Sequence, residues 1–530
     1  MSPGRPGPAK PLPSAGRVPI LRPMLHRLLW ILLGLSATAW AGQLTPSQER
    51  VLTGIARERF SGRWTDLTTN QLLELRKKAE AYDERLRERH LPGGMVVSLR
   101  FASTNSPEPV SYEALENSAA WTGLYLTACS YRWAVLHESR SLGDLRLVLE
   151  GLTRAARSTG RPGVLPRFAG RAADDLYKPV YGRFGGEDPK RPGYGRLAFR
   201  GEGDQANLVW LGGPNRDDYA AVNLGLATAW FYLRDAKMRG QISNLVVEVV
   251  GRMETDGWRL DDGKGNVTFA DPMLVTAWLR TAATVHPKAY AEKYDHQIAE
   301  LIRLREDAEV PETGFPRYGD IRPAFSRLVN ILALNRNETN QARRIAIQDR
   351  ITKMWQRSSS GLNPWPAVAF LSAFERIPVD STARSVIQGV LYEYPDPPRW
   401  SAARDLSGDT AVERIEADGR NHARYAQPLG KRPVFPFQWA ESGTLLQGGK
   451  DEPVMHPGVD LLLPYWIGRD VAVTPSEDSV APLDLKLRPP TGPGGRTNSL
   501  PSTNAPRRLG PTPRAPTGAS TGATNAPVRR

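Results

Sequence analysis

Residues 210–233 read WLGGPNRDDYAAVNLGLATAWFYL, a Gly-rich turn followed by polar residues and then by an apolar run. Apolar residues recur there at three- and four-residue spacing, at Val222, Leu226, Ala229 and Leu233. This periodicity predicts a helix, and Asn215 is a typical residue for its start. The first turn of the predicted helix therefore holds Arg216, Asp217 and Asp218.

Two explanations of the acidic residues in this turn stay open. Carboxylates at a helix start face the positive end of the helix dipole, so Asp217 and Asp218 are explained as capping residues. The surrounding residues favour a functional site instead, because a Trp, two Gly, an Asn, an Arg and a Tyr lie within the same stretch.

The chain opens with a basic segment, an apolar run at 28–35 and the sequence Ala39-Trp40-Ala41. This order is typical of a secretory signal peptide, and the apolar run is too short for a permanent membrane span. We therefore expect residues 1–41 to be removed and the mature protein to be periplasmic or extracellular. Met24 is an alternative start, and a retained N-terminal anchor is the alternative to cleavage.

The formal net charge of +14 is concentrated near the two ends of the chain. Residues 1–41 carry five Lys and Arg, residues 485–530 carry eight, and neither segment has an acidic residue, so that +1 remains for residues 42–484. This balance gives no indication of nucleic-acid binding. Cys129 is the only cysteine and the seven His are scattered, so the sequence predicts no disulfide, no metal site and no cofactor.

Helical periodicity continues along the chain as pairs of segments joined by short connections. The pairs are expected at 45–61 with 66–89, 112–137 with 141–159, 216–234 with 237–255, 271–285 with 288–304, 323–335 with 338–357, and 364–376 with 380–392. Short joints make neighbouring helices antiparallel. Six hairpins predict an all-α fold, an (α/α)6 toroid in which inner and outer helices alternate around a funnel.

Three segments lack this periodicity. Residues 161–210 are rich in Gly, Pro, Arg and Tyr, and a loop of that length is typical of a functional or disordered segment. Residues 395–475 are expected to form a largely irregular lid on the toroid, with a short helix at 458–467. Residues 476–530 have few apolar residues and are expected to be disordered. The predicted domains are 1–41, 42–394, 395–475 and 476–530.

Several blocks of the chain resemble known proteins. AAWTGLYLTACSYRWAV (119–135), TGRPGVLPRF (159–168) and PNRDDYAAVNLGLATAW (214–230) are similar to segments of exported bacterial proteins, as are PFQWAESG and PGVDLLLPYWIGR near the end. Those proteins belong with the six-hairpin glycosidase-like, (α/α)6-toroid superfamily, which includes glycoside hydrolases, polysaccharide lyases and sugar epimerases. The resemblance implies a toroid that acts on carbohydrate, without a specific reaction.

The resemblance also bears on single positions. Asp217 matches the Asp of an S-R-D-Q-Y pattern in those proteins. Two positions depart from them, because Pro166 stands where a small Ala is usual before Arg167, and Ala220-Ala221 replaces a Gly after the Tyr. The second departure is expected to narrow or reshape the pocket.

Glycoside hydrolysis needs two carboxyl groups beside the scissile bond, one protonated and one ionised. We expect Asp217 to act as the base and Glu202 or Asp204 as the acid, with Asp218 as a further candidate. An ordinary polar turn is the alternative explanation of Glu202 and Asp204.

Lyase or epimerase chemistry would use other residues. Tyr219 or a His would donate the proton, and Arg216 would neutralise a uronate carboxylate. His422 is the best-placed His, since it lies in the polar stretch RNHARY.

Tryptophans beside Gly, Pro or Asn are candidates for stacking on a sugar ring. Arg167 is explained equally well as a clamp for a ligand carboxylate and as a structural cap of carbonyl groups. The predicted substrate-binding residues are Trp121, Arg167, Trp210, Asn215, Arg216, Trp365, His422 and Trp439.

The sequence thus predicts an exported carbohydrate-active protein that acts on a glycan or polysaccharide by acid–base chemistry in the funnel of a toroid. One alternative is a non-catalytic toroid that binds a glycan or a partner protein. The other alternative is a uronate lyase or epimerase.

Overall fold

The computed structural model of the protein describes residues 66–185, 197–303, 321–358, 362–374, 381–417, 420–423 and 426–471. The predicted signal peptide, the predicted helix at 45–61 and the C-terminal tail lie outside these residues. The described part contains thirteen α-helices and a few small sheets. The prediction of a mostly helical chain is therefore confirmed.

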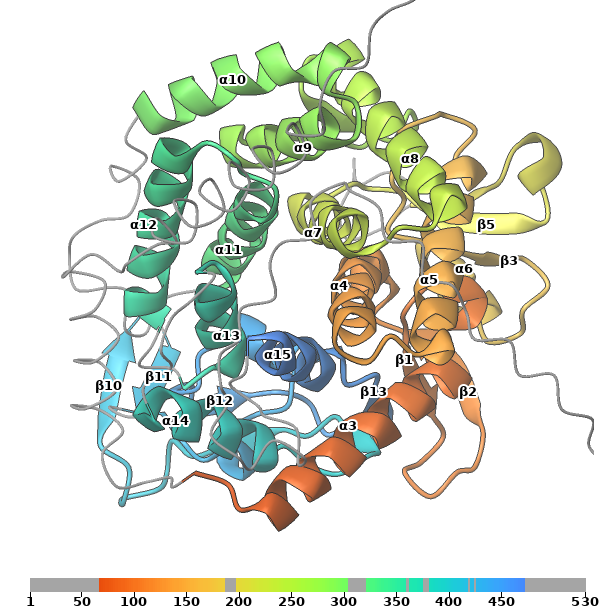
Figure 1. Cartoon of the computed structure of the whole chain (residues 1–530). Helices are drawn as coiled ribbons and strands as arrows, with labels where there is room; N and C mark the ends of the chain where they lie inside the picture. The colour runs from red at the N-terminus through yellow and green to blue at the C-terminus, as the bar shows by residue number, and fades with distance from the viewer. Residues whose placement is uncertain are drawn as a thin grey trace, which may run out of the picture. The chain divides into compact units, whose positions relative to one another are not determined.

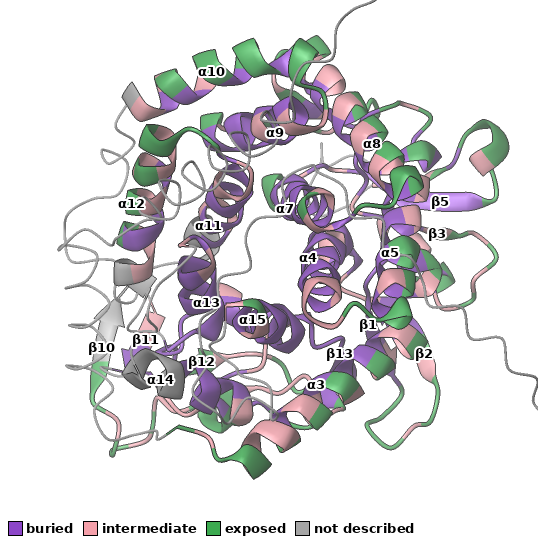
Figure 2. Ribbon diagram, viewed as in Figure 1, coloured by how far each residue is buried: buried purple, intermediate pink, exposed green. Residues whose placement is uncertain are grey.

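Six of the helices are buried along most of their length. They are α4 (Ser118–Leu136), α7 (Arg216–Tyr232), α9 (Pro272–Val285), α11 (Ile321–Arg336), α13 (Pro364–Ser372) and α15 (Val459–Asp470). Figure 2 shows buried residues almost all round α4, α7 and α15. Helices that are apolar on every side are stable only when other elements surround them.

Six further helices pack against these, and α5, α8 and α10 keep an exposed face, as Figure 2 shows. They are α3 (Thr69–Arg89), α5 (Ser139–Ser158), α8 (Ala236–Thr255), α10 (Pro287–Arg303), α12 (Gln341–Ser358) and α14 (Ser381–Tyr392). In chain order α5 packs on α4, α8 on α7, α10 on α9, α12 on α11 and α14 on α13. These five pairs are the hairpins expected from the periodicity of the sequence.

The buried helices also contact one another in succession. Along the chain α4 packs on α7, α7 on α9, α9 on α11, α11 on α13 and α13 on α15, and α15 returns to α4 (Figure 1). Helix α11 reaches α7 directly as well, beside α9.

The last helix, α15, lies where the sequence predicts a short helix at 458–467. It packs on α4, α13 and α3, and every residue from Val459 to Gly468 is buried. The Trp466 indole N–H donates to the Asp83 carboxylate of α3 at 3.1 Å, and Asp460 pairs with Arg399 at 2.5 Å. Helix α3 therefore has α15, at the far end of the sequence, as a helical neighbour, and it also packs on α14.

The strands form small antiparallel sheets beside the helices. One sheet has the order β2-β1-β13-β8, and the others are β3-β5-β4, β6-β7, β10-β11 and β12-β9. The strands are β1 (Ser98–Phe101), β2 (Pro109–Glu113), β3 (Phe168–Arg171), β4 (Ala198–Arg200), β5 (Leu208–Leu211), β6 (Arg259–Asp261), β7 (Val267–Phe269), β8 (Arg399–Trp400), β9 (Arg404–Asp405), β10 (Arg414–Ala417), β11 (Arg420–Ala423), β12 (Gln447–Gly448) and β13 (Val454–His456).

The segment 161–210, which has no helical period, contains the sheet β3-β5-β4 and the short helix α6 (Lys178–Phe184). In the register of this sheet Trp210 lies opposite Ala169 on one side and Phe199 on the other. Sheet formation explains how this Gly- and Pro-rich stretch is held in place immediately before α7. No helix in the described part of the chain is both long and apolar enough to cross a bilayer.

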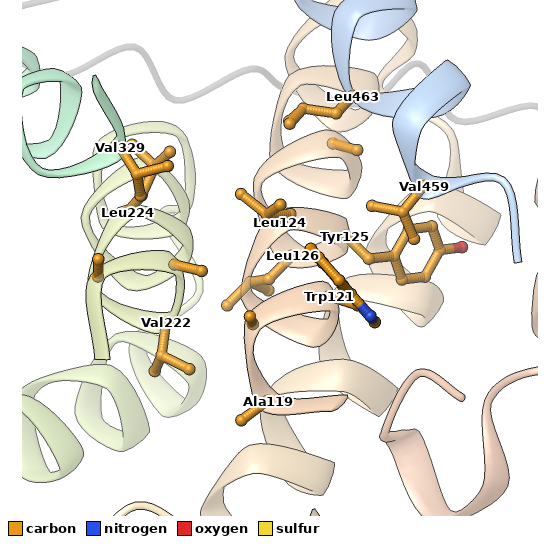
Figure 3. Packing of buried hydrophobic residues seen from close by; sticks show 14 of the residues in the cluster. Ala119, Trp121, Leu124, Tyr125, Leu126, Val222, Leu224, Val329, Val459 and Leu463 are labelled. Atoms are coloured by element: carbon orange, nitrogen blue, oxygen red, sulfur yellow. The ribbon is translucent and has the colours of Figure 1, made fainter. Parts of the chain in front are cut away.

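Helices α4 and α7 approach each other at backbone distance. A β-carbon at Gly123 would overlap the Ala221 backbone and lie 2.5 Å from the Val222 nitrogen. A β-carbon at Gly225 would lie 2.5 Å from the Gly123 carbonyl oxygen. Figure 3 shows the apolar side chains that surround this contact, among them Leu126 of α4. The Ala220-Ala221 departure noted in the sequence thus falls at the closest contact between the two helices.

We expect Gly123→Ala to lower the free energy of unfolding by about 1 to 3 kcal/mol, because the added methyl group must displace backbone rather than a flexible side chain. Gly143→Ala is the matched control, since Gly143 is also helical but exposed with nothing within 4 Å of an added β-carbon. The control should be more stable than the wild type by about 0.5 to 1 kcal/mol. Urea unfolding of the three proteins measures both changes, and equal stability of the two variants would contradict the close packing.

Candidate functional site

The start of α4 is capped by groups from distant parts of the chain. The Ala119 N–H donates to the Arg167 carbonyl at 2.8 Å, and the Ala120 N–H donates to the Asp218 carboxylate at 3.0 Å. The residue before the helix, Asn117, makes no side-chain capping bond within the described structure. Because first-turn amides have no acceptor inside their own helix, these two bonds satisfy donors that would otherwise be buried and unpaired.

Asp218 is at the same time part of the start of α7. Its backbone N–H donates to the Asn215 side-chain oxygen at 2.8 Å, and the Asn215 amide donates back to Asp218 Oδ2 at 2.7 Å. The sequence-predicted helix start at Asn215 is therefore confirmed. The Asp218 side chain links two helix N-termini and is 1% exposed.

Burial raises the pKa of the Asp218 carboxyl to about 8. The Arg167 guanidinium and the Ala120 N–H oppose this rise, while the charges of Asp217 and Glu116 add to it. Asp217 and Glu116 therefore lie within electrostatic range of the same buried carboxyl, one on α7 and the other just before α4.

Arg167 holds the two helix starts together. Its Nε donates to the Gly213 carbonyl just before α7, and its Nη1 donates to the Glu116 carbonyl just before α4 at 3.3 Å. Of the two explanations left open by the sequence, these contacts favour carbonyl capping.

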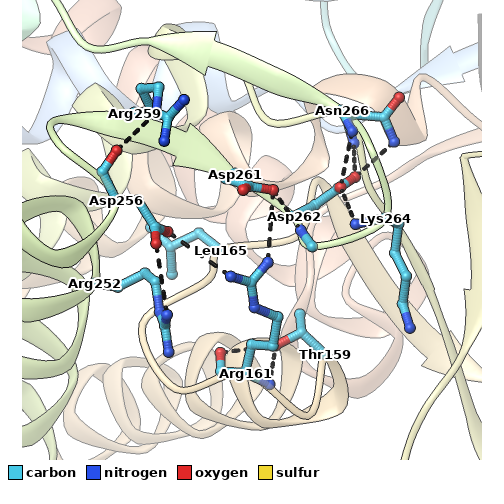
Figure 4. Close-up of polar contacts among 12 residues, drawn as sticks. Thr159, Arg161, Leu165, Arg252, Asp256, Arg259, Asp261, Asp262, Lys264 and Asn266 are labelled. Carbon is cyan, nitrogen blue, oxygen red and sulfur yellow. Dashed lines mark hydrogen bonds and ion pairs between the residues drawn. The ribbon is translucent and has the colours of Figure 1, made fainter.

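Asp262, in the turn between β6 and β7, also binds the Gly213 turn, through the Gly213 N–H. Its Oδ2 accepts from the Gly213 N–H at 2.9 Å. The same oxygen accepts from the Asn266 amide at 2.7 Å (Figure 4). Sequence reasoning did not single out Asp262, because its partner Gly213 is distant in the chain.

Ionic contacts tie the same hairpin to the loop after α5. Arg161 reaches Asp261 at 3.5 Å and Asp256 at 4.0 Å, and Thr159 accepts from the Arg161 N–H at 3.2 Å (Figure 4). These contacts place the loop that leads to Arg167.

Glu116 is a site residue that the sequence interpretation missed. It lies in the short 3-10 helix Leu115–Asn117, and its Oε2 is buried with no hydrogen-bond partner among the described residues. A buried carboxylate oxygen without a hydrogen-bond partner destabilises the folded protein unless another group binds it. Only the folded chain shows this, since Glu116 sits in no recognisable sequence pattern.

Trp121 lies one turn into α4 and stacks on Phe437, with ring centroids 5.2 Å apart and planes 7° apart. Phe437 in turn meets Phe325 edge-on at 5.2 Å. The Trp121 indole N–H is buried without a hydrogen-bond partner in the described part of the chain. Phe437, from the segment 395–471, thus covers Trp121 at the start of α4.

The exposed rim of the site is formed by the first residues of α7 and by β7. Arg216 donates to the Phe269 carbonyl at 2.8 Å and pairs with Asp271 at 3.8 Å. Phe269 is 66% exposed, and Asp217 is exposed beside Arg216. Phe269 was also missed by the sequence interpretation, because its place beside Arg216 depends on the β6–β7 hairpin.

The other predicted acids lie in the turn after β4. Glu202 pairs with Lys264 at 3.1 Å, and both Glu202 and Asp204 are exposed. Their predicted role as the acid stays a prediction.

Several predicted site residues are buried and bonded to the protein itself. The Tyr219 hydroxyl accepts from the Leu165 N–H at 3.1 Å, and the Trp210 indole donates to the Arg200 carbonyl at 3.2 Å. Such contacts favour packing over substrate binding.

The predicted residues of the C-terminal segment have similar surroundings. The Trp439 indole donates to the Asp460 carbonyl, and the His422 Nδ1 shares a hydrogen bond of 3.0 Å with the Thr444 hydroxyl. Both side chains are fully buried. Trp365 lies elsewhere, in a pocket between α4, α7, α11, α13 and α15.

Of the predicted residues, the structure thus gathers six at the starts of α4 and α7. We call the following group the α4–α7 site: Glu116, Trp121, Arg167, Asn215, Arg216, Asp217 and Asp218. Within the described ranges no group of three or more His, Cys, Asp or Glu side chains is placed to hold a metal ion.

Comparison with known proteins adds no assignment. A scan against models of protein families finds no match, and a search of curated protein sequences finds none either.

We expect Asp218→Asn to remove a pH dependence of stability. In the unfolded chain an Asp has a pKa of about 4, whereas the Asp218 pKa in the folded chain is about 8. Between these values the folded protein binds one more proton than the unfolded chain, so the contribution of Asp218 to stability is complete below the unfolded pKa and is lost as the pH rises through the folded pKa.

Urea unfolding of wild type and Asp218→Asn at about pH 5 and about pH 8 measures this contribution. The stability of the wild type relative to the variant should fall with rising pH, by at most about 1.4 kcal/mol per unit. A relative stability that stays constant or rises over this range would contradict the raised pKa.

Proposed function

We propose that the protein is an exported carbohydrate-active protein that acts on a glycan or polysaccharide at the α4–α7 site. The observation that carries the proposal is the convergence of Glu116, Asp217 and Asp218 at two helix starts beside Arg167. Acid–base chemistry on a glycosidic bond needs a pair of carboxyl groups in one place.

The proposed architecture is an (α/α)6 toroid. The succession of contacts from α4 through α7, α9, α11, α13 and α15 back to α4 supports a ring of inner helices, and the helices that pack outside them support the outer ring. In this arrangement α3 and α15 form the sixth pair. The α4–α7 site then lies where inner helices begin, which is the end we propose for the funnel.

Exposure supports the division of roles within the site. Asp217 is exposed and can take a proton from a water molecule or a substrate hydroxyl, so we assign it as the base. Glu116 is partly buried and lies just before α4, so we assign it as the second carboxyl group, the acid. Asp218 is 1% exposed and acts as a positioning residue, because it fixes both helix starts without facing solvent.

Aromatic groups at the site suit a sugar ring. Phe269 offers an exposed face beside Arg216. Sugars are commonly held by an aromatic face together with hydrogen-bond donors, since their rings have apolar faces and polar edges.

A non-catalytic toroid is the second candidate. It is favoured by the structural use of Arg167 and Asp218, whose contacts all serve the two helix starts. The lyase or epimerase alternative has less support, because Tyr219 and His422 are buried and bonded to protein groups.

The test is a screen of polysaccharides with the full chain, read out as release of reducing ends, beside Asp217→Asn and Glu116→Gln. We expect each variant to lose about 100-fold or more in kcat, the range of a missing acid or base, while circular dichroism stays unchanged. Glu202→Gln and Asp204→Asn are the matched controls, and we expect them to retain activity within about twofold, the scatter of surface changes.

Loss of activity in Glu202→Gln or Asp204→Asn with retention in Glu116→Gln would overturn the assignment of Glu116. Binding of glycans without turnover, equal in wild type and Asp217→Asn, would overturn the catalytic proposal and leave a binding protein.

A further inference from the structure

Two buried carboxyl groups share one guanidinium where α3, α4, α5 and α15 meet. Arg132 of α4 has its Nη1 at 3.4 Å from Asp83 Oδ2 of α3 and at 3.2 Å from Asp144 Oδ2 of α5. The three residues are 2% to 4% exposed, and we call them the Arg132 cluster. Arg132 lies in the last turns of α4 and not at its start, so the inference below does not rest on the proposed function.

Asp83 belongs to the buried face of α3. The buried residues of this helix recur at three- and four-residue spacing, and they are Leu75, Ala79, Tyr82, Asp83 and Leu86. Such spacing is typical of a helix face that packs on other elements. Asp83 is the member of this face that can carry a charge, so its protonation state affects how well α3 packs.

Neutral groups bind both oxygens of the Asp83 carboxyl group. The Trp466 indole N–H of α15 donates to Oδ2 at 3.1 Å, and the Tyr125 hydroxyl of α4 donates to Oδ1 at 3.4 Å. A hydroxyl accepts as well as donates, so Tyr125 can accept a hydrogen bond from Oδ1 when Asp83 is protonated. The protonated form of Asp83 therefore fits the same surroundings as the ionised form.

The Arg132 cluster holds two acids and one base. When both carboxyl groups are ionised, the cluster has one negative charge in excess inside the protein. Burial raises the pKa of Asp83 to about 6 and also raises the pKa of Asp144. The guanidinium of Arg132 opposes both rises without cancelling them.

The other titratable groups near the cluster leave this excess in place. Burial raises the pKa values of the Tyr125 hydroxyl and the Cys129 thiol well above their usual ranges, so both stay neutral. Arg140 acts on both carboxyl groups but is exposed to solvent, and Arg87 acts on Asp144 alone. Glu138 lies 4.0 Å from Arg132 Nη2, but its side chain is 49% exposed.

We propose that the Arg132 cluster is a pH-sensitive switch that holds α3 against α4, α5 and α15 while one of its two carboxyl groups is protonated. A proton taken from solvent removes the excess charge without breaking the contacts of Asp83. When both carboxyl groups are ionised, separation of α3 relieves the excess charge because Asp83 then enters water.

The direction of the pH effect follows from the two states of Asp83. Its pKa is about 6 in the docked helix, and about 4 for an Asp in water. Between these values the docked helix binds one more proton than the separated helix. The stabilisation of docking is therefore complete below the lower pKa and is lost as the pH rises through the higher one.

The test is amide hydrogen exchange of the full chain at about pH 5 and about pH 7.5, read by mass spectrometry of peptides from α3 and α9. Protection factors remove the intrinsic pH dependence of exchange, and comparison with Asp83→Asn removes the contributions of other titrating groups. We expect the protection of α3 relative to Asp83→Asn to be about tenfold higher at the lower pH. At the higher pH α3 should be less protected than α9, because α3 separates while the rest stays folded.

Asp144→Asn and Glu138→Gln form a matched pair, since each removes one carboxyl group beside Arg132. Asp144→Asn leaves one acid for one base, so the relative protection of α3 should change less than about twofold between the two pH values. This variant also replaces Asp83→Asn as the reference if that protein does not fold. Glu138→Gln should keep the tenfold change, because its carboxyl group is half exposed.

Three results would overturn the proposal. The first is the same change of α3 protection with pH in the wild type and in Asp83→Asn. The second is a loss of the pH dependence in Glu138→Gln equal to that in Asp144→Asn. The third is equal protection of α3 and α9 at the higher pH, which would mean that α3 opens only with the whole fold.

Discussion

The hydrogen bond from the Ala120 amide to the Asp218 carboxylate is the contact on which the rest of the site depends. Asp218 is bound at the same time by Asn215, so one carboxyl group joins the first turns of α4 and α7. The two helices can meet in this way only because Gly123 and Gly225 let their backbones touch one turn further on. The close packing of α4 on α7 and the capping of both helix starts by Asp218 therefore depend on each other.

This constraint keeps Asp218 buried, while other charged side chains of the site stay near the surface. With both helix starts fixed, Asp217 and Arg216 face outward from α7, and Glu116 is held at the edge of α4 through the Arg167 contact with its carbonyl. Burial raises the pKa of Asp218, and the neighbouring charges of Asp217 and Glu116 add to this rise. A carboxyl group with a raised pKa beside other carboxyl groups is typical of sites that carry out acid–base chemistry.

The sequence predicts local features well and tertiary ones poorly. The start of α7 at Asn215 and five helical hairpins follow from periodicity and capping, which depend on neighbouring residues. The pairing of α3 with α15 could not be predicted, since it joins segments nearly four hundred residues apart and rests on contacts such as Trp466 with Asp83. Glu116 and Phe269 were missed for the same reason, because their places are set by distant partners and not by spacing.

Amide hydrogen exchange at Ala120 tests the central contact most directly. Ala120 is in the first turn of α4, where an amide has no acceptor in its own helix and normally exchanges fast. The capping by Asp218 predicts slow exchange in the wild type, comparable to Ala128 in the middle of the helix, and faster exchange at Ala120 alone in Asp218→Ala. Fast exchange at Ala120 in the wild type would contradict the account, whatever the variant shows.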